Sequence, residues 1–558
     1  MLNAAILLAP LLAINWFAGR RGSGVLRTLR RPVRLLTRSP ILLIGFPGCI
    51  SLAISIAFVV FGSIPRPRVH DEFSNLLAAD TFAHGRLSNP AHPMWIHFES
   101  PHIIQQPTYA SKYPPAPGMI MAVSVLIAGL PIFGVWLSTS LSCCAVTWML
   151  AAWLRPRWAL LGGVLTAIHP IVLIWSQGYW GGSVSVLGGA LVLGAVGRLA
   201  KATTIRAAFL LGVGMAILAN SRPFEGLVLS LLSGIFLAVC LLQKPERAFL
   251  RDSLRIILPI GLVLVPVAAF MGYYNWRVTG NALRLPYQVH EATYGHAPLF
   301  IWQSPKNPPE YRHEQIRKLH EEWEWPFYER QRTSAGLSAE SVEKIKTLLD
   351  GYFCYPLLIV LLAVPGIPLV IADSRQRCPI LIGAFFLLAI LTETWMHPHY
   401  AAPVMGLWML IVLSGLRRLR CWKWHGRPVG RFLIPGSLAL SAILLIPFCK
   451  QYTRAKGEGW QIQRSRIHDE LVEAGGEHLV IVHYEKNHSP HDEWVYNGAD
   501  IDRERVIWAR EMTPKQNQTL IEYFKDRGIW FLEADDRHPS LTPFAPEYRM
   551  TARDRVDP

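Results

Sequence analysis

Two adjacent carboxylates, Asp71 and Glu72, follow a long apolar segment and are the residues best placed to do chemistry. Charged side chains where a membrane helix ends are unfavourable for packing, so they indicate either a site or a helix cap. The following residues predict a short amphipathic helix, with Gly85 at the position of a C-terminal cap. Both carboxylates would lie in its first turn, where the helix dipole favours their ionised form. The residue types leave a catalytic base and a capping pair equally open.

Two further polar stretches carry cations suited to an anionic ligand. Lys112 and Tyr113 precede a proline-rich turn, and they fit either a phosphate contact or a snorkelling lysine beside an interfacial tyrosine. Arg222 and Glu225 lie on either side of a helix-initiating proline. An arginine there can present a fork of donors to a phosphate. The other interpretation is an Arg222–Glu225 ion pair that locks two membrane spans together.

A third polar stretch holds His397, His399 and Tyr400 around prolines. The i, i+2 spacing of the histidines is a weak pattern for a metal site. Hydrogen bonds to a phosphate or a sugar suit these side chains better.

Long apolar blocks must position these stretches. The chain has 558 residues, of which 51% are hydrophobic and 17% charged, a composition that predicts a mainly α-helical, multi-pass membrane protein. About 12 spans are expected, near residues 1–18, 40–63, 134–154, 158–175, 183–199, 207–220, 224–242, 256–274, 352–372, 379–395, 400–416 and 431–449. The shorter apolar piece 117–130 is expected to be re-entrant or interfacial.

Lysine and arginine placement predicts the orientation. If the loop 19–39 is cytoplasmic and the spans alternate, the inner loops hold 24 basic residues and three acidic ones. Arg222 is the only lysine or arginine in the short outer loops. The net charge of +16 is therefore a topology signal and does not indicate a nucleic-acid binder. Residues 65–117, 275–351 and 450–558 are predicted to lie outside the plasma (inner) membrane.

Two domains are expected: a membrane domain over 1–449, with outer loops 65–117 and 275–351, and an extracytoplasmic α/β domain over 450–558. In the second, apolar runs near 478–484, 506–509 and 529–532 predict buried strands, and 514–526 predicts a helix. The eight cysteines fall mostly in or beside spans, which implies neither disulfides nor a zinc site.

Several of these strings resemble the C-type glycosyltransferase (GT-C) superfamily, in particular its protein mannosyltransferase and aminoarabinose transferase branch. They are the Asp71-Glu72 pair after an early span, GRLSNP, KYPPAPG, the RP-x-E pattern at Arg222 and HYAAP at His399. The resemblance implies a GT-C-like fold and transfer of a sugar from a polyprenyl phosphate to an outer acceptor. It implies Asp71 as the early acidic residue, assisted by Glu72. The loop 176–182 lacks the acid that many relatives have there, so a second acid acting from this loop is in doubt.

Displacing a phosphate from an anomeric carbon needs a base for the acceptor hydroxyl and cations for the leaving group. Asp71 is the predicted base, and Arg222, Lys112, His397 and His399 form the predicted phosphate side. One carboxylate suffices for single-step inversion. The expected partners are a polyprenyl-phosphate-linked sugar, the lipid bilayer and a glycan, lipid or protein acceptor, with no nucleic acid. No cofactor is expected, and an Asp-Glu pair rather than Asp-x-Asp favours a metal-independent reaction.

Two other functions fit the same chain. A transporter or flippase for lipid-linked saccharides would use membrane-embedded polar residues to carry a sugar, but no internal repeat is found in the sequence. A polymerase or ligase of surface polysaccharides would share the carrier and join preformed chains.

The charge bias of the loops makes the topology testable. Single-cysteine labelling should place residues near 90, 300 and 500 outside the membrane and residues near 30, 250 and 422 inside, because basic loops stay cytoplasmic. Finding 90 and 250 on the same side would separate the predicted site residues onto two faces.

Overall fold

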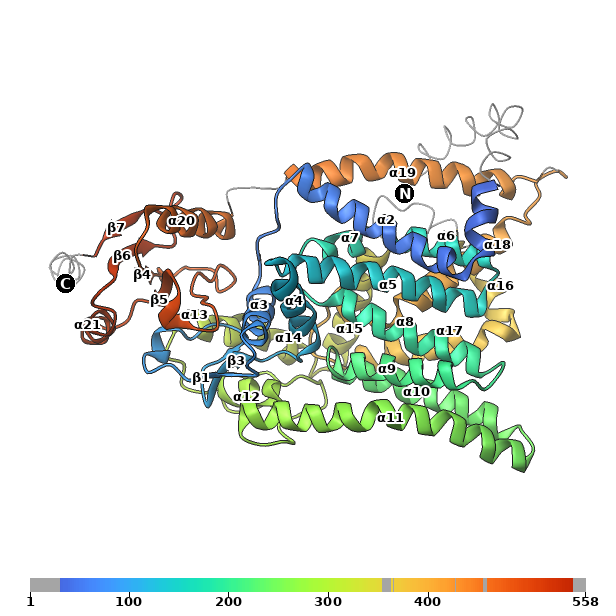
Figure 1. The fold of residues 1–558 in the computed structure, drawn as a ribbon, viewed down its shortest axis with the longest axis horizontal. Coiled ribbons are helices and arrows are strands. Elements are labelled where there is room, and N and C mark those ends of the chain that lie inside the picture. Colours follow the sequence, from blue (N-terminus) through green and yellow to red (C-terminus); the bar gives the residue numbers. More distant parts are fainter. Residues whose placement is uncertain (1–30, 354–362, 365, 427, 455–458, 545–558) are drawn as a thin grey trace.

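The computed structural model describes residues 31–353, 363–364, 366–426, 428–454 and 459–544 (Figure 1). The predicted span at 1–18 and the middle of the span predicted at 352–372 lie outside these residues. The long apolar helices run side by side, and a unit with a β-sheet lies at one end of them (Figure 1). Shorter helices and strands fill the region between the two.

The bundle is built from apolar helices that match most of the predicted spans. Among the described residues, seven helices are long and apolar enough to cross a membrane, or eight if the bent pair α6 and α7 is one span. Three further apolar helices are shorter, so the number of about 12 spans stays a prediction. The helices of the bundle are α2 (Pro40–Val60), α5 (Ile132–Trp153), α6 (Pro156–Ala167), α7 (Pro170–Ser176), α8 (Gly182–Leu199), α9 (Ile205–Ala219), α10 (Pro223–Leu242), α11 (Glu246–Thr279), α16 (Ile367–Ala372), α17 (Ser374–Ile390), α18 (Met405–Leu419) and α19 (Gly430–Arg454).

Small residues hold the centre of the bundle together. Within a bilayer the hydrophobic effect gives helices little reason to associate, so close backbone approach and dispersion must do so. The helix α8 is the most enclosed candidate span, with 83% of its residues buried. A Cβ atom on Gly214 of α9 would lie 2.8 Å from the carbonyl oxygen of Gly188 on α8. Larger residues at this crossing would push the two helices apart.

The helix α4 (Ala116–Ala128) corresponds to the segment predicted to be re-entrant or interfacial. Its 13 residues rise about 20 Å, too little for a hydrocarbon core of about 30 Å. Gly129, at φ +74°, ends it in the left-handed conformation. The apolar side chains Val123, Leu126 and Ile127 are exposed near its end, as suits a helix that meets lipid without crossing it.

Residues 65–117, which are predicted to lie outside the membrane and are called the first outer region, contain the helix α3 (His70–Ala83), the 3₁₀ turn η1 (Trp95–His97) and a small antiparallel sheet. The sheet has the order β1-β3-β2, from strands β1 (Asn89–Pro90), β2 (Ile103–Ile104) and β3 (Thr108–Ser111). The predicted C-terminal cap of α3 is confirmed. Gly85 has φ +70°, its N–H donates to Phe82, and the N–H of Arg86 reaches back to Thr81.

The second outer region is helical. Its elements are α12 (Pro286–Thr293), α13 (Glu314–Arg317), the π-helix η2 (Lys318–Glu324), α14 (Trp325–Arg330) and α15 (Ser334–Tyr352). A 3₁₀ segment, η4 (Pro398–Val404), leads from the last outer loop into α18.

The predicted strands of the C-terminal unit are observed as β4 (His478–His483), β5 (Val506–Arg510) and β6 (Gly528–Glu533). With β7 (Leu541–Pro543) they form a sheet of order β5-β4-β6-β7, in which β4 pairs in parallel with both of its neighbours. The short 3₁₀ turn η5 (Ile501–Arg503) precedes β5, and α21 (Pro514–Tyr523) connects β5 to β6. Every residue of β4 from His478 to Val482 is buried, because both faces of the sheet are covered.

The two faces of this sheet pack against different parts of the chain. Val480 and Val482 face α20 (Trp460–Ala474). Leu479 and Ile481 share an apolar cluster with Phe73 of α3 and with Phe98 and Tyr109 of the first outer region. The C-terminal unit and α3 therefore have a common core.

A buried ion pair also joins these parts. Arg510 at the end of β5 pairs with Glu493, and both side chains are 1% exposed. The Arg510 guanidinium also donates to the Glu99 carbonyl at 2.7 Å and to Gln315 at 3.3 Å. The cation thus contacts the first outer region, the second outer region and the C-terminal unit at once.

Candidate active site

Glu72 sets the position of α3. Its carboxylate accepts the backbone N–H of Arg68 at 2.5 Å and that of Tyr179 at 2.8 Å, so it joins the start of α3 to the loop that precedes α8. A Cβ atom on Gly178 would lie 2.5 Å from Oε1 of Glu72, so a larger residue there would displace this carboxylate. Burial raises the pKa of Glu72 to about 7, against the opposing effect of its two N–H donors. We therefore assign Glu72 a positioning role, since its oxygens accept backbone N–H groups, and the catalytic role expected for it beside Asp71 stays a prediction.

Asp71 points elsewhere. Its side chain is 28% exposed, and its Oδ1 atom accepts the hydroxyl hydrogen of Tyr113. Burial and the charge of Asp71 hold the pKa of Tyr113 well above its ordinary value, so the hydroxyl stays a donor. The second oxygen, Oδ2, lies 4.0 Å from Nε2 of His102. The two adjacent carboxylates thus divide the two roles left open by the sequence: Glu72 holds the backbone and Asp71 faces the candidate site.

Lys112 lies deep in the same region. Its side chain is 3% exposed, with Nζ 3.9 Å from Glu291 and 4.7 Å from the ring centre of Tyr287. The interpretation of Lys112 as a snorkelling surface lysine is therefore wrong, because the second outer region covers it. A buried cation beside only one carboxylate at this distance can still attract an anion.

Arg222 caps the start of α10 and forms the predicted ion pair with Glu225, with Nη1 and Oε1 3.2 Å apart. The guanidinium carbon lies 4.6 Å from the ring centre of Tyr400, a cation–π geometry. The Arg222 side chain remains 23% exposed. Only Nη1 has a hydrogen bond within the described part of the chain, so the pair leaves donors of the guanidinium available.

His397 and His399 are stacked with their ring centres 5.5 Å apart, and each meets Tyr400 edge to face. His399 also packs against Trp180 at 5.1 Å. The aromatic loop before α8 therefore contributes Trp180 to this group and Tyr179 to the Glu72 contact.

The tertiary structure brings the predicted residues into two neighbouring groups. Asp71, Lys112 and Tyr113 form one, and Arg222, Glu225, His397, His399 and Tyr400 form the other. The backbone N–H of Ala116 donates to Asn220 at 2.9 Å and ties the segments that carry them. Tyr400 lies within the electrostatic reach of both Asp71 and Arg222, and so does His397. The charges of the predicted base and of the predicted anion-binding group therefore act on the same two side chains.

Sequence reasoning missed Glu393 and His102. Glu393 lies between α17 and η4, its charge acts on Arg222 and Glu225, and its buried Oε1 atom has no partner among the described residues. An acid four residues before His397 was a signal in the sequence. His102 had no such signal, because its role depends on a contact with Asp71 that the fold creates.

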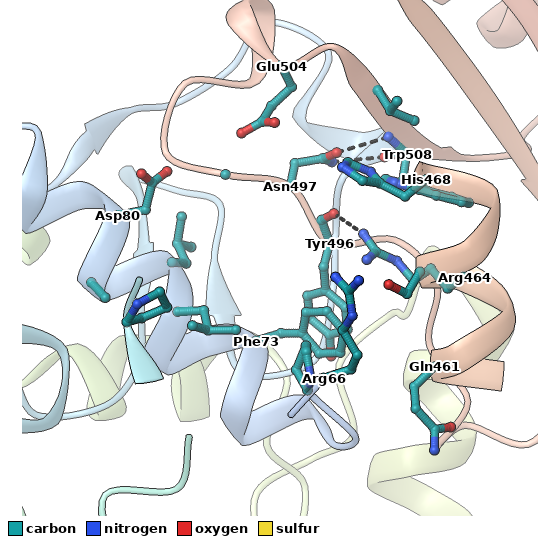
Figure 2. A pocket seen from close by; sticks show the side chains of 18 of the residues that line it. Arg66, Phe73, Asp80, Gln461, Arg464, His468, Tyr496, Asn497, Glu504 and Trp508 are labelled. Carbon is teal, nitrogen blue, oxygen red and sulfur yellow. Dashed lines mark hydrogen bonds between the residues drawn. The ribbon is translucent and has the colours of Figure 1, made fainter. Parts of the chain in front are cut away.

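A cavity of about 440 Å³ lies between α3 and the C-terminal unit (Figure 2). Phe73 and Asp80 of α3 face it, together with Arg464, Tyr496 and Glu504 of the C-terminal unit. Successive residues of an α-helix are about 100° apart, so Asp71 projects from the side of α3 opposite Phe73 and Asp80. This cavity therefore lies behind the candidate site and does not include it.

Within the described ranges, no three His, Cys, Asp or Glu side chains are arranged to hold a metal ion. The histidines near the end of β4 have other contacts. His488 bonds to Asp535 at 2.8 Å, and His491 packs against Trp323.

Comparisons with known proteins establish the fold. No family model matches this sequence, and no curated protein matches it.

ArnT from Cupriavidus metallidurans in its apo state is similar over 87% of this chain and 92% of that one, with 10% identity and a TM-score of 0.51. The same protein bound to undecaprenyl phosphate matches 89% of this chain and 98% of that one, with 11% identity and a TM-score of 0.50. An Archaeoglobus fulgidus oligosaccharyltransferase matches 88% of this chain and 69% of that one, with 9% identity and a TM-score of 0.48. The predicted GT-C-like fold is confirmed by the likeness to ArnT.

Replacing Glu72 by Gln tests the positioning role. A carboxyl whose pKa is raised in the folded state contributes its full stability below the unfolded value of about 4.5 and loses it as the pH rises through about 7. We expect the Tm of the wild type to fall across this window and Glu72→Gln to lack this part of the fall. Thermal unfolding followed between about pH 4 and 8 measures it.

The exposed Glu310→Gln is the matched control and should keep the wild-type profile. Identical pH profiles for the wild type and Glu72→Gln would contradict the assignment.

Proposed function

We propose that this protein is a glycosyltransferase that moves a sugar from a polyprenyl-phosphate donor to an acceptor at the outer face of the plasma membrane, by a single inverting displacement. The observation that carries the proposal is that the charges of Asp71 and Arg222 both act on Tyr400, whose ring centre lies 4.6 Å from the Arg222 guanidinium carbon. This arrangement supplies one base and one anion-binding group, which are the two requirements of the reaction.

The fold supports a lipid-linked donor. ArnT, whose fold the chain shares, has been solved with undecaprenyl phosphate bound. In the present chain the second group of site residues lies at the starts of α10 and η4, and α10 is long and apolar enough to cross a membrane, which suits a phosphate carried on a membrane lipid. A donor that is already activated by its phosphate needs no nucleotide site, and the sequence shows no phosphate-binding glycine loop.

In the proposed reaction the acceptor oxygen attacks the anomeric carbon while its proton passes to Asp71. The bond between the anomeric carbon and the phosphate oxygen breaks, and the phosphate keeps the electron pair. The hydroxyl of Tyr113 holds Oδ1 of Asp71, which directs Oδ2 to the acceptor. Attack from the face opposite the leaving group inverts the anomeric configuration.

The growing negative charge on the phosphate requires preorganised donors. Arg222 is held by Glu225 and Tyr400 and has unoccupied N–H groups, so it can bind the phosphate without first being ordered. Lys112, His397 and His399 add further donors around the same space. We propose that these side chains neutralise the phosphate without a divalent metal ion.

A panel of polyprenyl-phosphate sugars incubated with the purified protein tests the function directly, by following release of the carrier phosphate. Release with one donor supports the proposal. Binding of a donor without release, followed by its movement across a vesicle membrane, would instead support a transporter.

Asp71→Asn should lower turnover by about 10²–10⁴-fold, because the amide keeps the shape of the side chain but cannot accept the acceptor's proton. Steady-state release of carrier phosphate measures the loss, and Tm should be unchanged.

Asp80→Asn is the matched control, since it makes the same change on the opposite side of the same helix. A fully active Asp71→Asn protein would remove Asp71 as the base.

Arg222→Ala should lower kcat/KM for the lipid donor by roughly 10 to 100-fold, the range expected for hydrogen bonds to a charged group. Arg222→Lys should restore little of it, since an ammonium cannot replace a planar fork of donors. Kinetics at varied donor concentration measure both.

Arg277→Ala, which removes an exposed arginine packed on Tyr273, is the control and should behave as the wild type. If Arg222→Ala lowers only the Tm and leaves turnover intact, the Arg222–Glu225 pair is structural.

A further inference from the structure

Five histidines from separate segments meet beside Asp71. This histidine cluster comprises His70, His102, His290, His320 and His491. The ring centres lie 5.6 Å apart for His70 and His102, 5.9 Å for His102 and His290, 6.0 Å for His290 and His320, and 5.9 Å for His70 and His491. The proposed displacement leaves this cluster without a role.

His102 is held in an unusual conformation. Its φ of +64° places a residue with a side chain in the left-handed region, which costs free energy and is most often found at functional positions. Three contacts hold its backbone. The carbonyl accepts from Ser74 at 2.7 Å and from the N–H of Lys112 at 3.2 Å, and the N–H donates to His290 at 3.2 Å. The fold thus fixes the position of this imidazole.

The ring of His102 faces the oxygen of Asp71 that Tyr113 does not occupy. Its Nε2 atom lies 4.0 Å from Oδ2, and catalytic hydrogen bonds of this length commonly shorten when substrate binds. The other ring nitrogen, Nδ1, is buried and has no partner in the described part of the chain. A buried imidazole nitrogen without a partner is unfavourable unless another group uses it.

The cluster continues from His102 to solvent. His70 shares a hydrogen bond with the Tyr496 hydroxyl through Nδ1 at 2.7 Å, and its buried Nε2 has no side-chain partner among the described residues, with the Pro490 backbone near the ring. His491 packs against His70 on its other side and is exposed at the surface of the C-terminal unit. Three imidazoles with neighbouring ring centres 5.6 and 5.9 Å apart therefore lie between a carboxylate in the site and the surface.

We propose that His102, His70 and His491 form a proton relay that empties Asp71 after each transfer. This inference rests on the proposed function. The acceptor's proton arrives on Oδ2 of Asp71 and passes to Nε2 of His102, which releases its Nδ1 proton toward His70. His70 passes a proton to His491, and His491 releases one to water. Each imidazole gains one proton on one ring nitrogen and loses one from the other, so each ring returns to its starting tautomer by proton exchange before the next turnover. The carboxylate is restored, and no oxidant or reductant is needed.

The charges around the cluster suit this role. Burial, and then the charges of Lys112, His70, His290 and His320, hold the pKa of His102 well below its ordinary value. His70 has a pKa of about 4, chiefly because it is buried. Both rings are therefore neutral at rest and ready to accept a proton, and their protonated forms are short-lived. At the far end of the cluster from His491, the carboxylate of Glu324 shares a hydrogen bond of 2.7 Å with His320. Its negative charge stabilises positive charge on that imidazole.

Turnover of His102→Asn and His491→Ala tests the relay. Asparagine tolerates the left-handed conformation, so His102→Asn should fold while losing the ability to pass a proton. With the undecaprenyl-phosphate sugar that the wild type uses, both variants should slow multiple turnover by roughly 10²-fold. The first turnover should slow much less, because Asp71 can take up the first proton before the relay has to act.

Imidazole buffer provides the readout that a structural role would not move. His491 is at the surface, so free imidazole should restore multiple turnover to His491→Ala. The exposed His538→Ala in the same unit is the matched control and should need no rescue. Wild-type turnover in both His102→Asn and His491→Ala, or failure of imidazole to restore His491→Ala, would overturn the relay.

A measurement without turnover separates this inference from the proposed function. Deuterium exchange at the imidazole C2 position reports the pKa of each histidine in the intact protein. Asp71→Asn should lower the pKa of His70 and His102, because it removes a neighbouring negative charge, and should leave His538 unchanged. Absence of this shift overturns the relay even if the wild type releases carrier phosphate. The shift together with no release from any donor would instead overturn the proposed function and, with it, the transfer that the relay serves.

Discussion

The buried carboxylate of Glu72 is the contact on which the candidate site depends. It joins the chain before α3 to the loop before α8 through two backbone N–H groups, and so fixes where the first turn of α3 begins. Burial disfavours the ionised form of Glu72 and the two N–H donors favour it. The net result is a pKa of about 7 for this carboxyl. Asp71 is the preceding residue on the same turn, so its direction follows from this attachment.

The outer regions form the second constraint. Arg510 contacts Glu493, Glu99 and Gln315, and the sheet of the C-terminal unit shares its apolar core with α3. A buried ion pair adds little net stability, because desolvating both charges offsets most of their attraction. Its effect here is geometric, since each of its partners belongs to a different part of the chain. These contacts hold the two outer regions and the C-terminal unit together, and these are the parts of the chain that carry Asp71 and the histidine cluster.

Asp71 and Arg222 are each held in place by neighbouring side chains, and each keeps polar atoms that can contact a substrate. Tyr113 occupies one oxygen of Asp71 and leaves the other, while Glu225 and Tyr400 orient Arg222 and leave donors of its guanidinium. Ordering these side chains before substrate arrives lowers the cost of stabilising charge in the transition state. The second outer region covers Lys112 and also contains His290 and His320. The charges that act on Asp71 and on His102 therefore depend on how this one region packs.

The sequence alone determined the membrane class, most of the apolar helices, the strands of the C-terminal unit and the stretches around Asp71, Arg222 and His397. These features are local, because apolar periodicity, proline and glycine positions and charge bias act over a few neighbouring residues. It also contained Glu393, four residues before His397. Only the tertiary structure decided that Glu72 holds backbone while Asp71 faces the site, that Lys112 is buried, and that His102 meets Asp71. Residues 102, 179, 290 and 491 reach α3 from distant segments, and no local pattern encodes which side chains a fold brings within a few ångströms of one another.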